Sequence, residues 1–478
     1  MYHTKRIAKN SVFQGVALVA EGMTEVIVGL SLARMLGAEQ LGQFITLVTL
    51  AGMFAFISAF GLPSLLTREI ARLRDDPQHI AELVNTAVGL VMALSIVTIA
   101  LMLLLGMVAG YSATLMRALF LTAVALGVES TTLVVAASFR GIEDMKRSST
   151  VNAIMELSFT TLAVVMILFR AGTDVIMAVY LVSRIIAFLV ATALYRPYFG
   201  KLRPALDWQR WRALLRIGLP FSINSVFSFA YSRVDVVVLS FMTGSVLVGF
   251  YAAAYSLTMR LNILARTVTQ ALYPFLSHQH VSDERLMRTY AARSMHLLIM
   301  AAFLIAAIFW VFGHQFMSLV YGESFANTAT DAVKVLALAI PLRFIETSLS
   351  VTLDATNRSG QRATAVSIAA IANVLLNILL IPRYQLMGPV YATLLTEVLI
   401  CGLFIGYLRG EVRHVIAWRS FVAPVLGALL ILSIPLLLSS INVWILIILS
   451  VAIYVLTIAV LDRETIKPLM LMAMRRAQ

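Results

Sequence analysis

Apolar runs of 18 or more residues recur along the whole chain, and this pattern constrains the fold more than any other feature. A run of this length spans the hydrocarbon core of a bilayer as an α-helix. With 60% apolar and only 13% charged residues, the chain also lies outside the composition range of soluble proteins. The sequence therefore predicts an all-α polytopic membrane protein with fourteen transmembrane helices, at roughly 10–35, 42–65, 82–108, 113–139, 148–170, 174–195, 217–243, 246–275, 290–312, 332–354, 361–381, 386–408, 419–439 and 442–461.

The net charge of +13 would suggest a nucleic-acid partner in a soluble chain, but its distribution favours another explanation. Of the 37 Lys and Arg residues, 27 lie in the two termini and the even-numbered connections between spans. Excess Lys and Arg marks the cytoplasmic side of a membrane protein. We therefore expect a multi-pass protein of the cell (cytoplasmic or inner) membrane with both termini in the cytoplasm, and no nucleic-acid partner. The opposite side holds only Arg117, Arg170, Lys334 and Arg383.

Two pairs of segments in the chain match each other at a nearly constant offset. Gly37–Phe44 matches Gly244–Tyr251 at an offset of 207 residues, and Ala178–Arg184 matches Pro389–Leu395 at an offset of 211. The repeat unit is six spans, and an even number gives both halves the same orientation, so they form a parallel repeat. The predicted domains are an N-lobe at 1–195 with spans one to six, a cytoplasmic linker at 196–216, a C-lobe at 217–408 with spans seven to twelve, and two further spans with a cytoplasmic C-terminal tail at 409–478.

The linker permits two interpretations. Trp208, Trp211 and Leu214 can share one helix face beside Arg210 and Arg212, which is typical of an amphipathic helix at the membrane interface. A basic connector between the lobes explains the same residues equally well.

The loops argue against an enzyme. The longest outer connection, at about 313–331, has some 19 residues, so no extramembrane domain is available for a catalytic site. The sequence contains no Gly-rich phosphate loop, no H-E-x-x-H and no G-x-S-x-G. Its single cysteine, Cys401, permits no internal disulfide. We expect no catalytic residue, no metal site and no cofactor, and a monomer in the lipid bilayer.

Charged residues inside the predicted spans are numerous. At roughly 3 kcal/mol each for membrane insertion, thirteen of them would cost on the order of 40 kcal/mol, well above a typical net stability of about 5–15 kcal/mol. They must be paired with each other or face water. The thirteen are Glu21, Glu25, Arg34, Glu129, Glu156, Arg184, Arg233, Asp235, Arg260, Arg266, Arg343, Glu346 and Glu397.

Some of these charges have candidate partners. Arg343 and Glu346 are three residues apart on one helix and can meet directly. Glu129 and Glu156 lie toward the cytoplasmic ends of their spans, where basic loop residues can neutralise them. Arg34 lies at the outer end of the first span and can reach the interface.

Arg233 and Asp235 cannot pair within their helix, because residues two apart point about 200° away from each other. At least one of them must face another helix or water. A central cavity lined by spans one, two, seven and eight would collect Arg233, Asp235 and Arg260 with Glu21 and Glu25. Arginines in a hydrated cavity suit a phosphate or pyrophosphate, and the acidic residues could bind a coupling proton or sodium ion, or sugar hydroxyls. A buried structural pair is the alternative for each.

Three stretches near the N-terminus, "KNSVFQGVALV", "LARMLGAEQLGQF" and "FGLPSLLTREIAR", resemble the opening of the polysaccharide transporter family of oligosaccharide flippases. The segment "SRVDVVVLSFMTGSVLVGFYAAAYSL" resembles the seventh and eighth spans of the same family. The resemblance covers both halves. The superfamily, of multidrug, oligosaccharidyl-lipid and polysaccharide exporters, also includes multidrug and toxic-compound extrusion proteins and lipid II flippases.

The resemblance implies two six-helix lobes in a V shape that open alternately to each membrane face. The implied substrate is an oligosaccharide on a polyprenyl pyrophosphate, moved from the inner to the outer leaflet. Cavity arginines would hold the pyrophosphate, with Arg233 and Arg260 as first candidates and Arg184 and Arg34 after them. The alternatives are an ion-coupled multidrug exporter and a lipid II-type flippase. Against the latter, the first span carries Glu21 and Glu25 where such a flippase would carry arginines.

Overall fold

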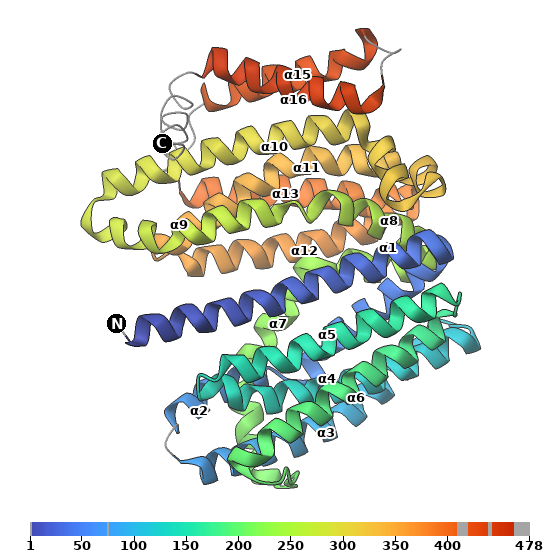
Figure 1. Ribbon diagram of the computed structural model, residues 1–478, viewed down its shortest axis with the longest axis vertical. Helices are drawn as coiled ribbons and strands as arrows, with labels where there is room; N and C mark the ends of the chain where they lie inside the picture. The colour runs from blue at the N-terminus through green and yellow to red at the C-terminus, as the bar shows by residue number, and fades with distance from the viewer. Residues whose placement is uncertain (1, 74–75, 409–418, 438–441, 463–478) are drawn as a thin grey trace. The chain divides into compact units, whose positions relative to one another are not determined.

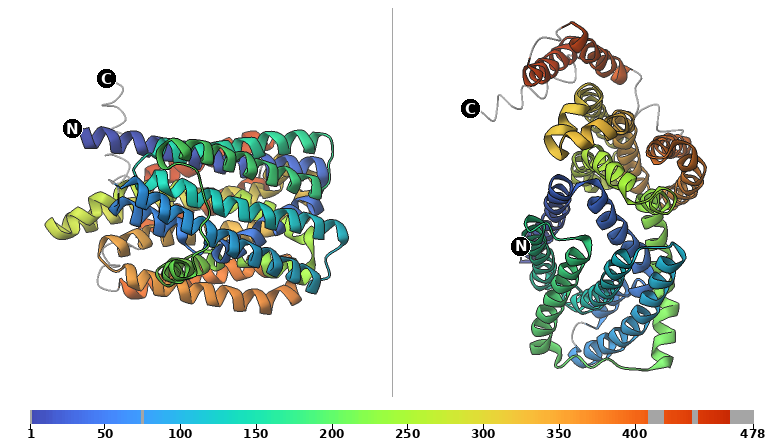
Figure 2. Two further views of the ribbon diagram at one scale, coloured as in Figure 1. Left: turned by 90° about the horizontal axis from the view of Figure 1, so that it is seen from below. Right: turned by 90° about the vertical axis from the view of Figure 1, so that its right-hand side faces the viewer.

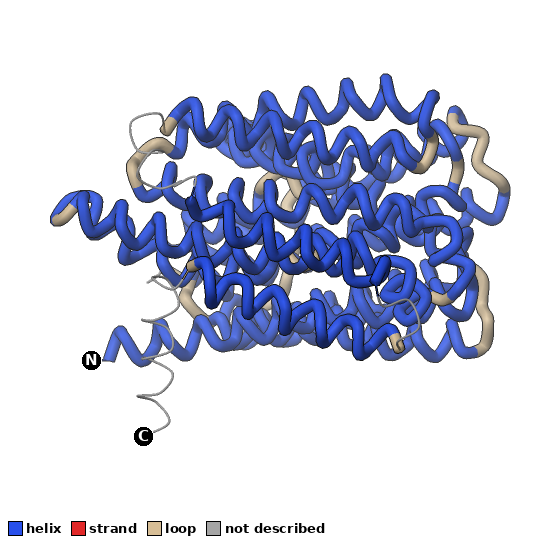
Figure 3. Tube along the Cα trace, turned by 90° about the horizontal axis from the view of Figure 1, so that it is seen from above, coloured by secondary structure: helices blue, strands red, loops and turns tan. Residues whose placement is uncertain are grey.

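A computed structural model describes residues 2–73, 76–408, 419–437 and 442–462, and every secondary-structure element in this part of the chain is a helix (Figure 3). The chain divides into two compact units, Met1–Gly249 and Phe250–Gln478. The first unit holds α1 (Tyr2–Ser58), α2 (Leu62–Arg72), α3 (Pro77–Val108), α4 (Ala113–Gly141), α5 (Met145–Leu168), α6 (Thr173–Phe199), α7 (Trp208–Thr243) and the start of α8 (Ser245–Met259). The second holds α9 (Asn262–Ser282), α10 (Glu284–Tyr321), α11 (Glu323–Ala355), α12 (Ser359–Tyr384), α13 (Met387–Tyr407), α15 (Arg419–Leu437) and α16 (Val443–Leu461) (Figure 1).

The all-α membrane-spanning architecture predicted from the sequence is confirmed. Among the described residues, ten helices are long and apolar enough to cross a bilayer, or twelve if each of two bent pairs counts as one span. A shorter apolar helix covers Phe421–Ile434. The count of fourteen spans stays a prediction, and the predicted tail beyond residue 462 lies outside the described residues.

The two glycines matched by the sequence repeat have the same backbone conformation. Gly37 interrupts α1 with φ 85° and ψ −175°, and Gly244 separates α7 from α8 with φ 86° and ψ 177°. Only glycine adopts this region without strain. The repeat therefore marks a break that divides the first from the second span in each half.

Aspartate side chains outside the spans cap the N-termini of several helices. Asp76, Asp144, Asp207 and Asp283 each accept a hydrogen bond from a backbone N–H in the first turn of α3, α5, α7 and α10, respectively. Such caps satisfy donors that a helix start leaves free. Capping thus accounts for four of the acidic residues that the chain places in its connections between spans.

The first unit is a bundle in which α4 packs against α3 and α6, while α5 packs against α1 and α6 (Figures 1 and 2). Small residues allow close approach. The hydroxyl of Ser58 in α1 lies 3.0 Å from that of Ser95 in α3 and 2.9 Å from that of Ser130 in α4. Interhelical contacts between small polar residues stabilise membrane bundles, where lipid supplies no hydrophobic drive.

The connector between α6 and α7 is held against α3. The backbone N–H of Arg203 donates to Asn85 Oδ1 at 2.9 Å, and that of Ala205 donates to the Asn85 carbonyl at 3.0 Å. The indole Nε1 of Trp211 donates to the Thr86 carbonyl at 3.1 Å. The amphipathic residues of the linker form the first turns of α7, so its apolar face packs on α3 through Trp211 and the buried Leu214.

In the second unit α10 packs against α11, and α12 against α13. The C-terminal pair α15 and α16 packs along α10 through Ile431 and Tyr454. The Tyr454 hydroxyl donates to the Met300 carbonyl at 2.7 Å, and His296 of α10 contacts Asp462 directly after α16. Two polar contacts therefore join α16 to α10.

Candidate functional site

Arg233 and Asp235 follow a bend in α7 and point in different directions. The segments Trp208–Phe227 and Ser232–Thr243 meet at 66°. The Arg233 side chain is 42% exposed, whereas Asp235 is buried and its Oδ1 accepts the backbone N–H of Val236 at 2.9 Å. The structure therefore separates the two charges, as the helix geometry predicted.

Arg233 approaches the first helix. Its Nη2 lies 3.6 Å from Oε1 of Glu25, whose side chain is 50% exposed. Glu21, one turn earlier on α1, is also exposed. Exposed charges within apolar spans are expelled from lipid and occur where water reaches the protein interior. Glu21, Glu25 and Arg233 define one face of the first unit.

Behind this face, α1 is joined to α5 by threonine hydroxyls. The Thr24 hydroxyl lies 2.7 Å from that of Thr160 and 3.4 Å from the Glu156 carbonyl oxygen. Thr24 is buried, although its neighbours Glu21 and Glu25 are exposed. One side of α1 thus packs on the bundle and the other carries the carboxylates.

Arg184 is the centre of a buried polar cluster. Its Nε lies 3.0 Å from Oε2 of Glu129 in α4, and its Nη2 lies 3.4 Å from Oε1 of Glu156 in α5. The Tyr180 hydroxyl donates to the same Glu129 oxygen at 3.1 Å, and the guanidinium carbon lies 4.0 Å from the centre of the Tyr180 ring. The Arg184 side chain is 5% exposed, so its guanidinium is occupied by protein groups in this conformation.

The partner of Glu129 and Glu156 differs from the sequence-based expectation. Basic loop residues were expected, and the structure instead provides Arg184 from the middle of α6. Opposite charges far apart in the sequence reach the same depth only when α4, α5 and α6 pack together. No local pattern in the sequence indicates that Arg184 is the partner of these carboxylates. Nor does any pattern indicate that Tyr180 and Thr24 take part in the polar contacts described above.

Arg34 and Arg260 are the two remaining arginine candidates. Arg34 is exposed on α1, three residues before the break at Gly37. Arg260 belongs to the second unit, where it is half-buried between α8 and α9 and its Nε donates to Ser256 Oγ at 2.7 Å. The assignment of Arg233, Arg260, Arg184 and Arg34 to pyrophosphate, and of Glu21, Glu25 and Asp235 to a cation or sugar, stays a prediction.

The second unit has its own buried ion pair. Nη1 of Arg343 in α11 donates to Oε1 of Glu397 in α13. The sequence suggested Glu346 as the partner of Arg343, and the structure shows a partner on another helix that the sequence did not suggest. The first unit contains an equivalent ion pair between the fourth and sixth spans of its half. There the fourth span carries the acidic residue, Glu129, and the sixth carries the basic one, Arg184, whereas in the second unit Arg343 is in the fourth and Glu397 in the sixth.

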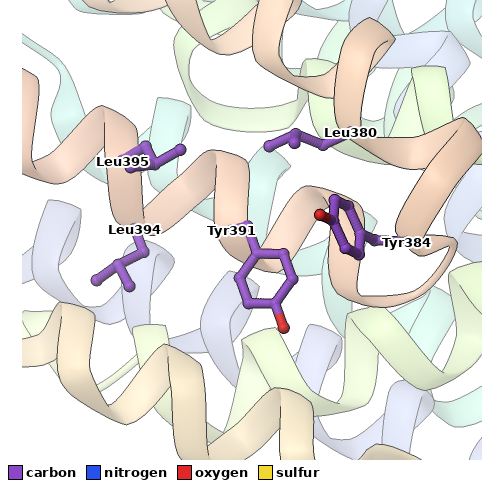
Figure 4. A pocket seen from close by; sticks show the side chains of 5 residues that line it. All are labelled: Leu380, Tyr384, Tyr391, Leu394 and Leu395. Carbon is purple, nitrogen blue, oxygen red and sulfur yellow. The ribbon is translucent and has the colours of Figure 1, made fainter.

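A surface pocket between α12 and α13 is lined by Leu380, Tyr384, Tyr391, Leu394 and Leu395 (Figure 4). The rings of Tyr384 and Tyr391 are nearly perpendicular, with centroids 5.4 Å apart. No charged side chain lines this pocket, so it lacks the groups that would bind a pyrophosphate. Within the described ranges, no cluster of three or more His, Cys, Asp or Glu could hold a metal ion.

Comparison with protein families gives two matches. The model of the family described as "Polysaccharide biosynthesis protein" matches residues 7–280, and the MatE model matches residues 220–380. Among curated proteins, the "Probable low-salt glycan biosynthesis flippase Agl15" of Haloferax volcanii is 22% identical over 376 residues, which cover 76% of this chain and 75% of that protein.

Two solved structures show the same fold. The "Lipid II flippase MurJ, inward closed conformation" aligns with a TM-score of 0.74 at 12% identity, covering 94% of this chain and 99% of that one. A multidrug resistance MATE family transporter of the MOP superfamily, in an inward-facing conformation, aligns with a TM-score of 0.60 at 15% identity, covering 82% and 94%. At these identities the likeness concerns the fold alone.

Proposed function

The chain belongs to the polysaccharide biosynthesis protein family, whose model matches more than half of its length, and we propose that it is a flippase for lipid-linked oligosaccharide. It would move an oligosaccharide on a polyprenyl pyrophosphate from the inner to the outer leaflet of the cell membrane by alternating access. The family match, a relative named as a glycan biosynthesis flippase and the MurJ-like fold support a transporter rather than an enzyme.

One observation supports this function more directly than any other. Arg233 and Glu25 are about half exposed within apolar spans, where a charge is stable only beside water or a charged ligand. A guanidinium presents a fork that matches two phosphate oxygens. At 3.6 Å the Arg233–Glu25 pair is loose, so a pyrophosphate could replace the carboxylate as the partner of Arg233.

The surroundings suggest how the site would divide its tasks. Arg233 would hold the pyrophosphate, Arg260 is the candidate of the second unit for the same role, and Arg34 would act nearer the outer surface. Glu21 and Glu25 would accept sugar hydroxyls or bind a coupling proton or sodium ion. Arg184 would join the site only if its bonds to Glu129 and Glu156 break. We propose a monomer with both termini in the cytoplasm and with the lobe boundaries 1–195, 196–216, 217–408 and 409–478.

A second candidate, an ion-coupled multidrug exporter, is favoured by the MatE match and by the exposed carboxylates of Glu21 and Glu25. It predicts that acidic rather than basic residues determine transport. Dye efflux that is lost in Glu21→Gln and retained in Arg233→Ala would support this exporter over the flippase. A lipid II-type flippase is less well supported, because α1 places glutamates rather than arginines at this face.

The experiment uses cells that depend on this protein for their surface polysaccharide. Arg233→Glu or Arg260→Glu should abolish surface polysaccharide and accumulate the lipid-linked precursor in the inner leaflet. Arg117→Glu, at an exposed position outside the site, is the matched control and should export normally. Normal export by the double variant with alanine at 233 and 260 would overturn the assigned role of both arginines.

A further inference from the structure

Glu397 is the most completely buried carboxylate among the paired acidic groups of the second unit. Its side chain is 2% exposed. Oε1 accepts a hydrogen bond from Arg343, whereas Oε2 is buried and has no hydrogen-bond partner among the described residues. A buried carboxylate oxygen without a donor is costly when the group is ionised, and protonation removes most of that cost.

The helices that pack on α13 determine which charges Glu397 senses. From α11 it faces Arg343 and Glu346, which attract and repel its charge, respectively. From α12, Asn373 Nδ2 donates to the Oγ1 of Thr396, the residue before Glu397, at 3.1 Å. On α13 itself, the thiol of Cys401 donates to the Leu342 carbonyl at 3.2 Å.

Glu346 has further interactions of its own. It lies within electrostatic range of Arg343, of Arg266 from α9 and of Arg362 from α12. Its Oε2 is 3.3 Å from the Thr347 hydroxyl, which in turn is 3.1 Å from Asn262 Oδ1 of α9. Glu346 is also half-buried. Its charge is therefore better compensated than that of Glu397.

We propose that Glu397 is a proton-binding site of the second unit, with Arg343 as the group that senses its charge. A proton bound at Oε2 makes the carboxyl neutral and removes one ionic partner of Arg343. The guanidinium then turns to Glu346, three residues further along the same helix. The bond between α11 and α13 is thus an ion pair when Glu397 is ionised, and it is weaker when the proton binds, because only a neutral Oε1 then accepts from Arg343.

The site suits a proton better than a metal ion. Sodium requires several oxygen ligands, and the described residues hold no group of three or more metal-binding side chains. Pro341 interrupts the hydrogen-bond ladder of α11 two residues before Arg343. A change in the Arg343 bond therefore acts next to a point where α11 can bend. As a coupling site this inference rests on the proposed transport function, but proton binding itself does not.

Infrared difference spectroscopy tests the proposal on the purified full chain in lipid nanodiscs, without substrate. As the pH is lowered, the wild type should gain a C=O band of a protonated buried carboxyl. Glu397→Gln should lack this band. Glu346→Gln should keep the band but show it only at lower pH, because the variant removes a charge that repels that of Glu397. Arg343→Gln should keep the band to higher pH, because loss of an opposite charge strengthens proton binding by about 10- to 1,000-fold.

The outcomes separate the possibilities. If Glu397→Gln shows the same band as the wild type, the proton lies elsewhere and the proposal is wrong. If Glu397→Gln does not yield monodisperse protein, the comparison of Arg343→Gln with the wild type decides, and an unchanged titration overturns the proposal. A normal titration in a protein that fails to flip lipid-linked oligosaccharide would overturn the proposed function but not the proton site.

Discussion

Gly42 lies against the backbone carbonyl of Ser245, and Gly249 lies against that of Ala38. A Cβ added to Gly42 would come 1.7 Å from the Ser245 oxygen, and one added to Gly249 would come 2.0 Å from the Ala38 oxygen. Ala38 and Ser245 follow Gly37 and Gly244 directly. Two equivalent segments of the repeat thus pack backbone to backbone through their glycines, as small residues allow in membrane bundles.

Alanine at either glycine should destabilise the first unit. Because the obstacle is backbone and cannot rotate away, Gly42→Ala and Gly249→Ala are each expected to cost about 1–3 kcal/mol. The measurement is the fraction of monodisperse protein after graded heating in detergent. Gly29→Ala is the control, since nothing lies within 4 Å of an added Cβ there. Equal heat resistance of all three variants would contradict the close contact.

The pairing of Arg233 with Glu25 allows a charge-exchange test of the site. If the two residues serve only each other, the double variant Arg233→Glu, Glu25→Arg should restore export that Arg233→Glu abolishes. If Arg233 binds a pyrophosphate, the exchanged pair should stay inactive, because it moves the guanidinium to α1. We expect no restoration, measured as surface polysaccharide per cell at equal amounts of membrane protein.

Removal of Arg184 should be strongly destabilising. It would leave Glu129 and Glu156 partly buried without their partner, and breaking such a pair typically costs about 3–5 kcal/mol. We expect Arg184→Met to reduce the yield of folded protein. The triple variant that also carries Glu129→Gln and Glu156→Gln should recover part of this loss, because it leaves no unpaired charge. A single variant as heat-resistant as the wild type would show that Arg184 is not structural.

Asp76, outside the spans, provides a pH-dependent cap. Two hydrogen bonds lower the pKa of Asp76. The bond from the backbone N–H of His79 has the larger effect, and the bond to the His79 side chain has the smaller one. The cap therefore contributes stability above the pKa of an unfolded aspartate and loses it as the pH falls through the lowered value. Asn keeps an acceptor but does not titrate, so Asp76→Asn should remove the acid-induced fraying of α3. Hydrogen exchange of the first turn of α3, corrected for intrinsic amide chemistry, measures this.

Identical acid dependence in Asp76→Asn and the wild type would assign the fraying to another group. Asp207→Asn is a matched control, because Asp207 caps α7 with Oδ1 bonds to the backbone of Gln209 and Arg210. That substitution should leave exchange in α3 unchanged.

Much of the architecture could be predicted from local properties of the chain. The length of the apolar runs determines that they are membrane helices, and the matched glycines at 37 and 244 identify the break between spans before any coordinates are known. The divergence of Arg233 and Asp235 also followed from helix geometry alone. These features depend on neighbours within a few residues, which the sequence displays directly.

The partners of the buried charges were decided by the tertiary structure. Nothing near Glu129 or Glu156 in the sequence indicates Arg184, and Arg343 bonds to Glu397 on another helix although Glu346 is closer along the chain. An isolated charge in a membrane span must find a partner or water, and this requirement reveals that a partner exists. Which group fulfils it depends on the depth and rotation of each packed helix, and these are set by the packing of many side chains rather than by any one segment.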